Sequence, residues 1–139
     1  MMKEITSVHN AAAQLLRELQ KPRARREHGL FVCESAKMVG EAVALHLAQT
    51  LFVEKGREAE YAQMAAQAES MGCALYVVSQ AVMQAVSTAK TPQGIVCTAK
   101  IPEPPKTLTG KRIVALDGVQ DPGNVGTILR TADAAGFDG

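Results

Sequence analysis

The chain has 139 residues, of which 47% are hydrophobic and 21% are charged, and its formal net charge is only +1. These values exclude an intrinsically disordered chain, and no apolar run approaches the roughly 18 to 20 residues that a membrane span needs. The first residues also lack the apolar core and cleavage site of a signal peptide, so we expect a soluble, cytoplasmic protein.

The first predicted element is an amphipathic helix, which is followed by a basic loop. Apolar residues recur at helical spacing over residues 8–19, and Pro22 is expected to end this helix. Residues 1–28 carry six basic and three acidic side chains, whereas residues 29–70 carry three and six. The positive charge is therefore concentrated on the first helix and on the loop 21–29, as a phosphate-binding edge requires. A solvated surface loop explains the same charges equally well. The candidate phosphate contacts are Lys21, Arg23, Arg25, Arg26 and, further along the chain, Lys37.

Short apolar runs then alternate with helical patterns as far as residue 99. The runs predict strands over residues 30–34, 50–54, 75–79 and 94–99, and helices over residues 35–48, 57–72 and 80–87. Ser35 and Ser79 are expected to cap the helices that follow them, and Gly72 to lie just past the end of one. Helices between successive strands indicate right-handed crossovers and a largely parallel sheet that is buried on both faces. Residues 1–100 are therefore predicted to form a compact three-layer α/β sandwich.

A proline-rich segment separates this domain from the rest of the chain. Residues 101–110 carry three prolines and no periodic pattern, so we expect a stiff, extended linker. Beyond it, residues 112–118 predict a strand and residues 124–135 a helix, with Gly136 as its stop. About 29 residues are too few to enclose a core, since unaided domains become difficult below about 40 residues. The unit 111–139 is therefore expected to be incomplete here or to be completed by another chain.

Cysteine and histidine spacing indicates neither disulfides nor a metal site. The cysteines lie far apart, in or beside apolar runs, which is typical of reduced core residues. They are Cys33, Cys73 and Cys97. The three histidines have no ligand-like spacing to one another or to the cysteines, and we therefore predict no metal.

The segment LDGVQDPGNVGTILRTADAAG, residues 116–136, gathers Asp, Pro, Gly and Asn into one predicted turn between a strand and a helix. Pro122 fixes φ, Gly126 allows close backbone approach, and Asn124 can cap the helix or present its amide to a ligand. Ligands of α/β sheets bind beyond the carboxyl ends of strands, where helix N-termini also lie. The pattern is neither G-x-G-x-x-G nor G-x-x-x-x-G-K-[ST], so a dinucleotide or nucleoside triphosphate site is unsupported.

The predicted helix after this turn has one apolar side and one polar side. The expected buried stripe consists of Val125, Ile128, Leu129, Ala132 and Ala135. Arg130 lies on another side, about 9 Å along the helix axis from Asn124, where it can clamp a phosphate with two parallel hydrogen bonds. A capping Asn, a surface Arg and a tight turn explain the same residues without any ligand.

These residues closely resemble the first signature of the SpoU (TrmH-like) family of RNA ribose 2′-O-methyltransferases in the SPOUT superfamily, which combines Asp-Pro-x-Asn-x-Gly with a following Arg-Thr-Ala. The segment KTPQGIVCTA, residues 90–99, is similar to the family's segment before the interdomain linker. KPRARREHGLFVCES, residues 21–35, resembles the start of its N-terminal RNA-binding domain. The resemblance implies that residues 1–100 fold like a kink-turn-binding ribosomal protein. It also implies that residues 111–139 form the first β-α unit of a SPOUT (α/β knot) domain.

By position, Asn124 and Arg130 match the Asn and Arg that are implicated in catalysis in the family. The family proposal is that the Arg activates the ribose 2′-hydroxyl for attack on the methyl group of S-adenosylmethionine. Because a guanidinium hardly loses a proton, positioning the target phosphate and stabilising the developing alkoxide is the easier physical interpretation. Asn124 would then orient the ribose or Arg130.

Two departures from the family pattern affect what the resemblance implies. Relatives commonly have Glu-Gly where this chain has Glu34-Ser35, which leaves the conformation of that loop open. Two later signatures, which build the knot, the S-adenosylmethionine pocket and most of the dimer interface, are absent before Gly139. We therefore expect the complete protein to be a homodimeric methyltransferase that acts on ribosomal RNA, and this chain alone to be inactive and without a donor pocket.

Two other functions fit the same residues. Residues 1–100 could act as a non-catalytic RNA-binding module with a vestigial tail, whose affinity would fall steeply with salt. A phosphate-binding metabolic domain that uses the turn 121–126 is the third alternative, against which the missing nucleotide fingerprint speaks.

Overall fold

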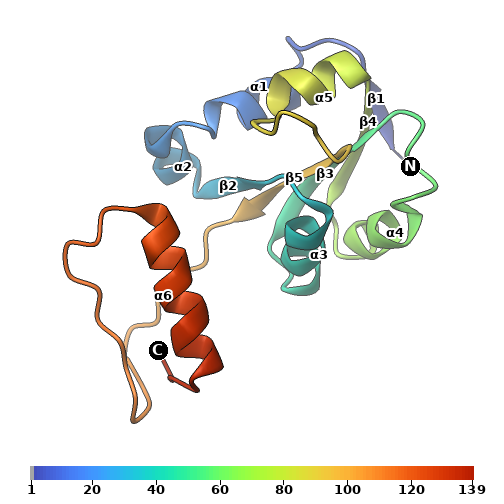
Figure 1. Ribbon diagram of the computed structural model, residues 1–139. Helices are drawn as coiled ribbons and strands as arrows, with labels where there is room; N and C mark the ends of the chain where they lie inside the picture. Colours follow the sequence, from blue (N-terminus) through green and yellow to red (C-terminus); the bar gives the residue numbers. More distant parts are fainter. Residues whose placement is uncertain (1) are drawn as a thin grey trace. The chain divides into compact units, whose positions relative to one another are not determined.

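The computed structural model describes residues 2–139, which form five strands and six helices. The chain divides into two compact units (Figure 1), the first ending at Pro102 and the second comprising Glu103–Gly139. Among the described residues, all the strands and five of the six helices belong to the first unit. No helix within residues 2–139 is long and apolar enough to cross a bilayer.

The first unit is built around a mixed sheet. Its strands are β1 (Lys3–Ile5), β2 (Leu30–Cys33), β3 (Ala48–Glu54), β4 (Ala74–Val78) and β5 (Ile95–Lys100). They lie in the order β1-β4-β3-β5-β2. The strands β1, β4 and β3 are parallel, whereas β5 is antiparallel to both β3 and β2. The strand β2 therefore runs in the direction of β3, and β5 opposes the other four.

The direction of β5 departs from the predicted series of parallel crossovers. After α5 (Gln80–Val86), the loop 87–94 brings the chain to the carboxyl end of β3, where the N–H of Glu54 donates to the carbonyl of Gly94 at 2.9 Å. The strand β5 begins there and runs back alongside β3. The apolar pattern predicts a helix between two strands, but it does not say at which end of the sheet the chain re-enters. A helix of 7 residues is also too short, at about 10 Å, to guarantee a full crossover.

Helices cover both faces of the sheet. The remaining helices of this unit are α1 (Ala11–Glu18), α2 (Pro22–His28), α3 (Ala36–Ala44) and α4 (Ala62–Ser70). Side chains of α1 and α5 pack around Phe52, whereas those of α3 and α4 pack around Leu51. Successive residues of a strand point to opposite faces, so these neighbours on β3 belong to two different cores.

Residues 22–28 form the helix α2, where the sequence predicted a basic loop over residues 21–29. Pro22 occupies the first helical position, where its missing N–H costs nothing, and Gly29 ends the helix with a left-handed φ of 63°. Arg23 and Glu27 form an ion pair of 2.6 Å one turn apart. The prediction was wrong because a proline after one helix can equally begin the next, and α1 has already ended at Glu18.

The other predicted elements of this unit are confirmed with shifts at their ends. The hydroxyls of Ser35 and Ser79 accept hydrogen bonds from the N–H groups of Met38 and Val82, at 3.1 and 3.3 Å. The helix α4 begins five residues later than predicted, at Ala62, and the short strand β1 was not predicted. The three cysteines are buried and free, as expected for core residues.

The second unit contains one helix, α6 (Pro122–Ala134), and no strand within residues 103–139. The strand predicted over residues 112–118 is therefore wrong for this chain. A β-ladder needs a second extended segment alongside it. The carbonyl of Arg112 accepts a hydrogen bond from the N–H of Asp138 at 2.7 Å, and the N–H of Val114 donates to the carbonyl of Gly139 at 2.8 Å. Only Asp138 and Gly139 bond to the segment 112–114, and two residues are too few to form a ladder.

Candidate nucleic-acid interface and candidate catalytic turn

The turn before α6 is closed by Asp121, which caps the helix. Its backbone is extended, and its Oδ1 accepts a hydrogen bond from the N–H of Asn124 at 2.8 Å. Pro122 then occupies the first helical position. Of the two roles considered for Asn124, capping the helix is therefore excluded. Asn124 lies exposed in the first turn, and its side-chain amide makes no hydrogen bond within residues 2–139, so it can face a ligand.

Arg130 reaches back toward the start of α6. Its Nη2 donates to the hydroxyl of Thr127 at 3.3 Å, and this hydroxyl donates to the carbonyl of Gly123 at 2.9 Å. Its Nη1 lies 3.2 Å from the point that a Cβ on Gly126 would occupy. Long helical side chains lean toward the helix N-terminus, and the glycine leaves space for this one to do so. The guanidinium therefore lies beside the first two turns of the helix, the first of which carries Asn124.

The apolar stripe of α6 is only partly covered. Val125, Ile128 and Ala132 are half-buried, whereas Leu129 is 53% exposed. The predicted stripe is therefore less buried than expected, because within residues 103–139 no further helix or strand packs against it. A hollow of about 210 Å³ lies between this stripe and the last residues of the chain. It is smaller than the roughly 300 to 1,000 Å³ of ligand pockets, so we assign none of these residues to a cofactor.

The five basic side chains predicted to contact phosphate have different surroundings in the first unit. Arg25 is half-buried, and its Nη1 donates to the carbonyls of Leu19 and Gln20 at 3.0 and 2.9 Å, which satisfies the end of α1. Arg23 is exposed but paired with Glu27. Three others present their charges to solvent: Lys21, Arg26 and Lys37. Arg25 is therefore a structural residue as well as a candidate contact.

A pocket of about 330 Å³ lies between α2 and the carboxyl end of β2. It is lined by Leu19, Gln20, Arg25, Phe31, Val32, Glu34 and Thr88. A second hollow, of about 450 Å³, shares Gln20 with this pocket. It is lined by Gln14, Arg17, Glu18, Gln20 and Lys21. The basic helix and the Glu34 loop, which are separate in the sequence, therefore face one concave surface.

The carboxylate of Glu34 holds the start of the loop before β5. It accepts hydrogen bonds from the N–H and the hydroxyl of Thr88 at 3.0 Å, from the hydroxyl of Ser87 at 3.0 Å and from the N–H of Ala89 at 3.3 Å. The next residue, Ser35, has an extended backbone with a φ of −106°. An extended backbone does not require a glycine at this position. The serine that replaces the glycine of the resembled family pattern therefore acts as an ordinary N-cap of α3.

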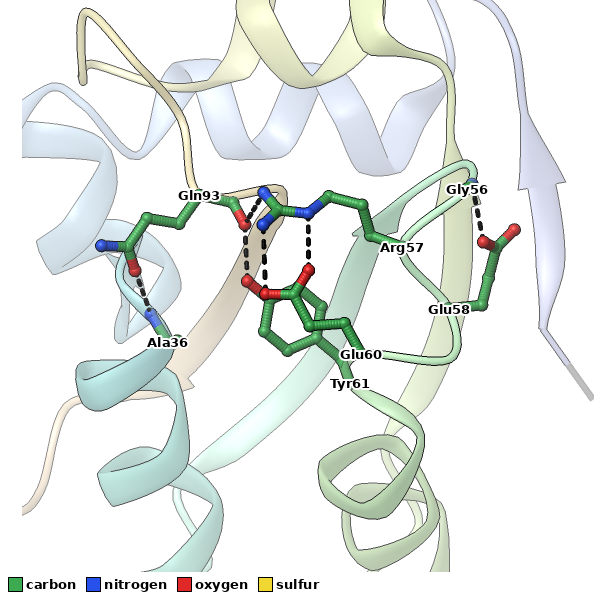
Figure 2. A network of polar contacts seen from close by, with 7 residues as sticks. All are labelled: Ala36, Gly56, Arg57, Glu58, Glu60, Tyr61 and Gln93. Carbon is green, nitrogen blue, oxygen red and sulfur yellow. Dashed lines mark hydrogen bonds and ion pairs between the residues drawn. The ribbon is translucent and has the colours of Figure 1, made fainter.

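The far end of the same loop is held by Gln93 (Figure 2). Its carbonyl accepts hydrogen bonds from Nη1 of Arg57 at 2.5 Å and from the hydroxyl of Tyr61 at 2.6 Å. Its side-chain oxygen accepts one from the N–H of Ala36 at 2.9 Å. Arg57 also forms a bidentate pair with Glu60, at 2.8 and 3.0 Å, which lowers the pKa of that carboxyl. The loop is therefore fixed at both ends.

Between these two anchors the loop carries Lys90, an exposed cation that sequence reasoning missed. The anchors on Glu34 and Ala36 flank the start of α3, so Lys90 lies at the same end of the sheet as Lys37. The segment KTPQG offered only a partial signal, namely its glycine, which indicates a turn; in the structure Gly94 has a φ of +73°. Within residues 2–139, no three His, Cys, Asp or Glu side chains are grouped closely enough to hold a metal ion.

Comparison with known proteins decides the family. A family model described as the MRM3-like substrate binding domain matches residues 10–97. The chain is also 33% identical over 137 residues to the 23S rRNA (guanosine(2553)-2′-O)-methyltransferase RlmP of Bacillus subtilis. The chain belongs to the family of this substrate-binding domain, and its homologues are SpoU/TrmH-family rRNA methyltransferases. The match covers 99% of this chain but 53% of RlmP, so the chain spans about half the length of the family members that it matches.

Solved structures of methyltransferases have the same fold. The AdoMet-bound rRNA methyltransferase from Sinorhizobium meliloti is 34% identical with a TM-score of 0.83, over 99% of this chain and 53% of the other. An RNA 2′-O ribose methyltransferase is 31% identical with a TM-score of 0.70, over 96% of this chain and 53% of the other. The mixed α/β fold predicted from the sequence is therefore confirmed, and S-adenosylmethionine is the cofactor expected in this family.

Proposed function

We propose that the protein carrying this chain is an S-adenosylmethionine-dependent RNA ribose 2′-O-methyltransferase that acts on ribosomal RNA. The chain would supply RNA binding and part of the active site. The observation that carries the proposal is the turn before α6, where Asp121 takes the capping role and leaves the amide of Asn124 exposed beside the folded-back Arg130. The activities named for two relatives, methylation of rRNA and of the RNA 2′-oxygen, support the same reaction.

In this proposal Arg130 holds the phosphate beside the target ribose and stabilises the negative charge that develops on the 2′-oxygen. A guanidinium stays protonated in proteins, so it acts through charge and hydrogen bonds and not as a base. Thr127 restrains the guanidinium before the RNA arrives, and Asn124 presents its amide to the ribose. S-adenosylmethionine, when bound, supplies the electrophilic methyl group. Placing the 2′-oxygen in line with that group accounts for much of the acceleration.

The first unit would hold the RNA through phosphate contacts around the pocket beside β2. The proposed contacts are Lys21, Arg23, Arg25, Arg26, Lys37 and, in addition, Lys90. Their charges are exposed, except that Arg25 is half-buried, and the loop that carries Lys90 is fixed at both ends, so little entropy is lost when RNA binds. Because each phosphate contact releases counterions, affinity should decrease steeply with salt.

Methyl transfer by variants of the protein tests the catalytic assignment. Arg130→Ala and Asn124→Ala should each lower the rate of RNA methylation by about 10²- to 10³-fold, the usual effect of removing one hydrogen-bond donor from a developing oxyanion. Asp133→Ala, at an exposed position of the same helix, is the matched control and should retain the wild-type rate. RNA affinity should be unchanged in Asp133→Ala, and in the other two variants it should decrease much less than the rate, because the phosphate contacts of the first unit still hold the RNA. Near-normal methylation by the first two variants would remove this assignment.

A non-catalytic RNA-binding module is the second candidate function. It is favoured by the self-contained sheet and two cores of the first unit, within which the family match at residues 10–97 lies. A module would bind RNA but transfer no methyl group in any protein that carries it.

We further propose a homodimer in the cytoplasm on the basis of the family resemblance, and sedimentation of the complete protein tests the dimer.

A further inference from the structure

We propose that the pocket beside the free edge of β2 binds one unpaired nucleobase of the RNA, whose edge pairs with the backbone N–H and C=O of Val32. This inference rests on the proposed RNA-binding function of the first unit. It assigns a place to a base, whereas the basic side chains described above contact phosphates.

The pairing of β2 with β5 determines which of its backbone groups are available. Within residues 2–139, the strand β2 lies at the edge of the sheet and pairs with β5 alone. At the start of their ladder, the N–H of Ile101 donates to the carbonyl of Gly29 at 2.9 Å. Bonded and non-bonded residue pairs alternate along an antiparallel ladder. Leu30 and Val32 are therefore non-bonded positions, whose N–H and C=O groups point away from β5 toward the free edge.

The pocket provides both an apolar floor and polar walls at this edge. The side chain of Val32 packs on the α1 and α5 side of the sheet, the side from which Leu19 also lines the pocket. Gln20, Arg25 and Thr88 contribute an amide, a guanidinium and a hydroxyl to the walls. A nucleobase has an apolar face and a rim of adjacent donors and acceptors, and the N–H and C=O of one residue complement such a rim. The volume of about 330 Å³ lies in the range of small-ligand pockets.

Charge and strand length favour RNA over a peptide strand or a second copy of this chain. The adjoining hollow carries Arg17 and Lys21, and Arg26 is exposed on α2, so a phosphate backbone that enters the pocket would meet cations. The carboxylate of Glu34 already accepts four or more hydrogen bonds from the loop before β5, which offsets its repulsion of RNA. The strand β2 has only 4 residues, with α2 and α3 close to its ends, and thus offers little edge to another strand.

Backbone amide NMR of the isotope-labelled chain tests this proposal. The probe is a single-stranded RNA of about six nucleotides, compared with the same sugar-phosphate backbone without bases. The amide of Val32 should shift with the intact RNA and not with the abasic strand, whereas amides of α2 should shift with both. The intact RNA should bind at least about fivefold more tightly, which corresponds to about 1 kcal/mol for one base.

A variant that fills the pocket provides a second measurement. Val32→Phe adds bulk on the pocket side of β2 without changing charge, and it should bring the affinity ratio of intact to abasic RNA close to one. Val77→Phe enlarges a half-buried valine on β4 that does not line the pocket, and it should keep the wild-type ratio. The NMR spectrum of each variant shows whether it is folded.

Four results would overturn the proposal. Equal Val32 shifts with intact and abasic RNA, or RNA binding without any Val32 shift, would remove the base site but leave the RNA-binding function standing. A Val32 shift that grows with protein concentration in the absence of RNA would mean that a second copy pairs with this edge. Absence of any RNA binding at low salt would overturn the proposed function itself, and the base site with it.

Discussion

The loop before β5 depends on a glycine that has no space for a side chain. Gly94 is buried with a φ of +73°, and a Cβ on it would lie 2.5 Å from Cδ and 2.8 Å from Nη1 of Arg57. Gly94→Ala therefore strains the backbone and also displaces the side chain that binds the carbonyl of Gln93. We expect this substitution to destabilise the first unit strongly.

Its magnitude follows from two separate costs. A left-handed conformation costs alanine about 1–2 kcal/mol relative to glycine. Displacing the side chain of Arg57, which then loses its hydrogen bond to the carbonyl of Gln93, costs about 1–3 kcal/mol more. We therefore expect Gly94→Ala to lower the free energy of unfolding by about 2–5 kcal/mol. Gly56→Ala is the matched control, because Gly56 has a φ of +93° but nothing within 4 Å of its Cβ position, so that only the first cost applies.

Urea denaturation followed by tyrosine fluorescence measures both variants. Both tyrosines of the chain, Tyr61 and Tyr76, lie in the first unit, so their fluorescence reports on that unit alone. In an Arg57→Ala background the clash is absent, and the cost of Gly94→Ala should fall to that of Gly56→Ala. If Gly94→Ala costs no more than Gly56→Ala in the wild-type background, the loop is not fixed by this contact and the reasoning is refuted.

Four further predictions concern the end of α1, the RNA surface, pH and the methyl donor. Arg25→Ala should lower the free energy of unfolding by about 1 kcal/mol, because the last carbonyls of α1 lose a donor, and equal stability would contradict its structural role. Arg26→Ala should leave stability unchanged but weaken RNA binding and reduce the salt slope by about 1, as measured by fluorescence anisotropy. The pKa of Glu60 is lowered mainly by its hydrogen bond to Arg57, so its stabilising contribution is complete above the ordinary glutamate pKa of about 4.3 and is lost as the pH falls through the lowered value. Unfolding midpoints measured at decreasing pH should show this loss in the wild type and not in Glu60→Gln, and identical profiles would contradict the pairing. Calorimetry of this 139-residue chain with S-adenosylmethionine should give no binding heat, and a saturable heat would show that the chain contains a donor site after all.

The sequence predicted those elements that local chemistry determines. Serine caps at Ser35 and Ser79 and the apolar runs of β2, β4 and β5 were sufficient to place the α/β pattern. The strand β1 was missed because it has only 3 residues, of which Ile5 alone is buried. The direction of β5 depends on where a loop re-enters the sheet, and no local pattern records that.

The candidate site shows the same division between local and long-range information. The positions of Asn124 and Arg130 on α6 follow from the turn sequence, although the capping residue proved to be Asp121. The fixed position of Lys90 depends on the bonds between Glu34 and Thr88, which are 54 residues apart. Contacts at that separation cannot be predicted from one sequence without an alignment.

The position of the transferred methyl group tests the central claim most directly. The protein carrying this chain is incubated with ribosomal RNA and S-adenosylmethionine labelled in its methyl group, and the RNA is then hydrolysed in alkali. A methyl group on a 2′-oxygen blocks cleavage of the adjacent phosphodiester bond. We predict that the label appears in alkali-resistant dinucleotides and that Arg130→Ala removes it. Label in mononucleotides, which indicates base methylation, or undiminished label with Arg130→Ala would contradict the account.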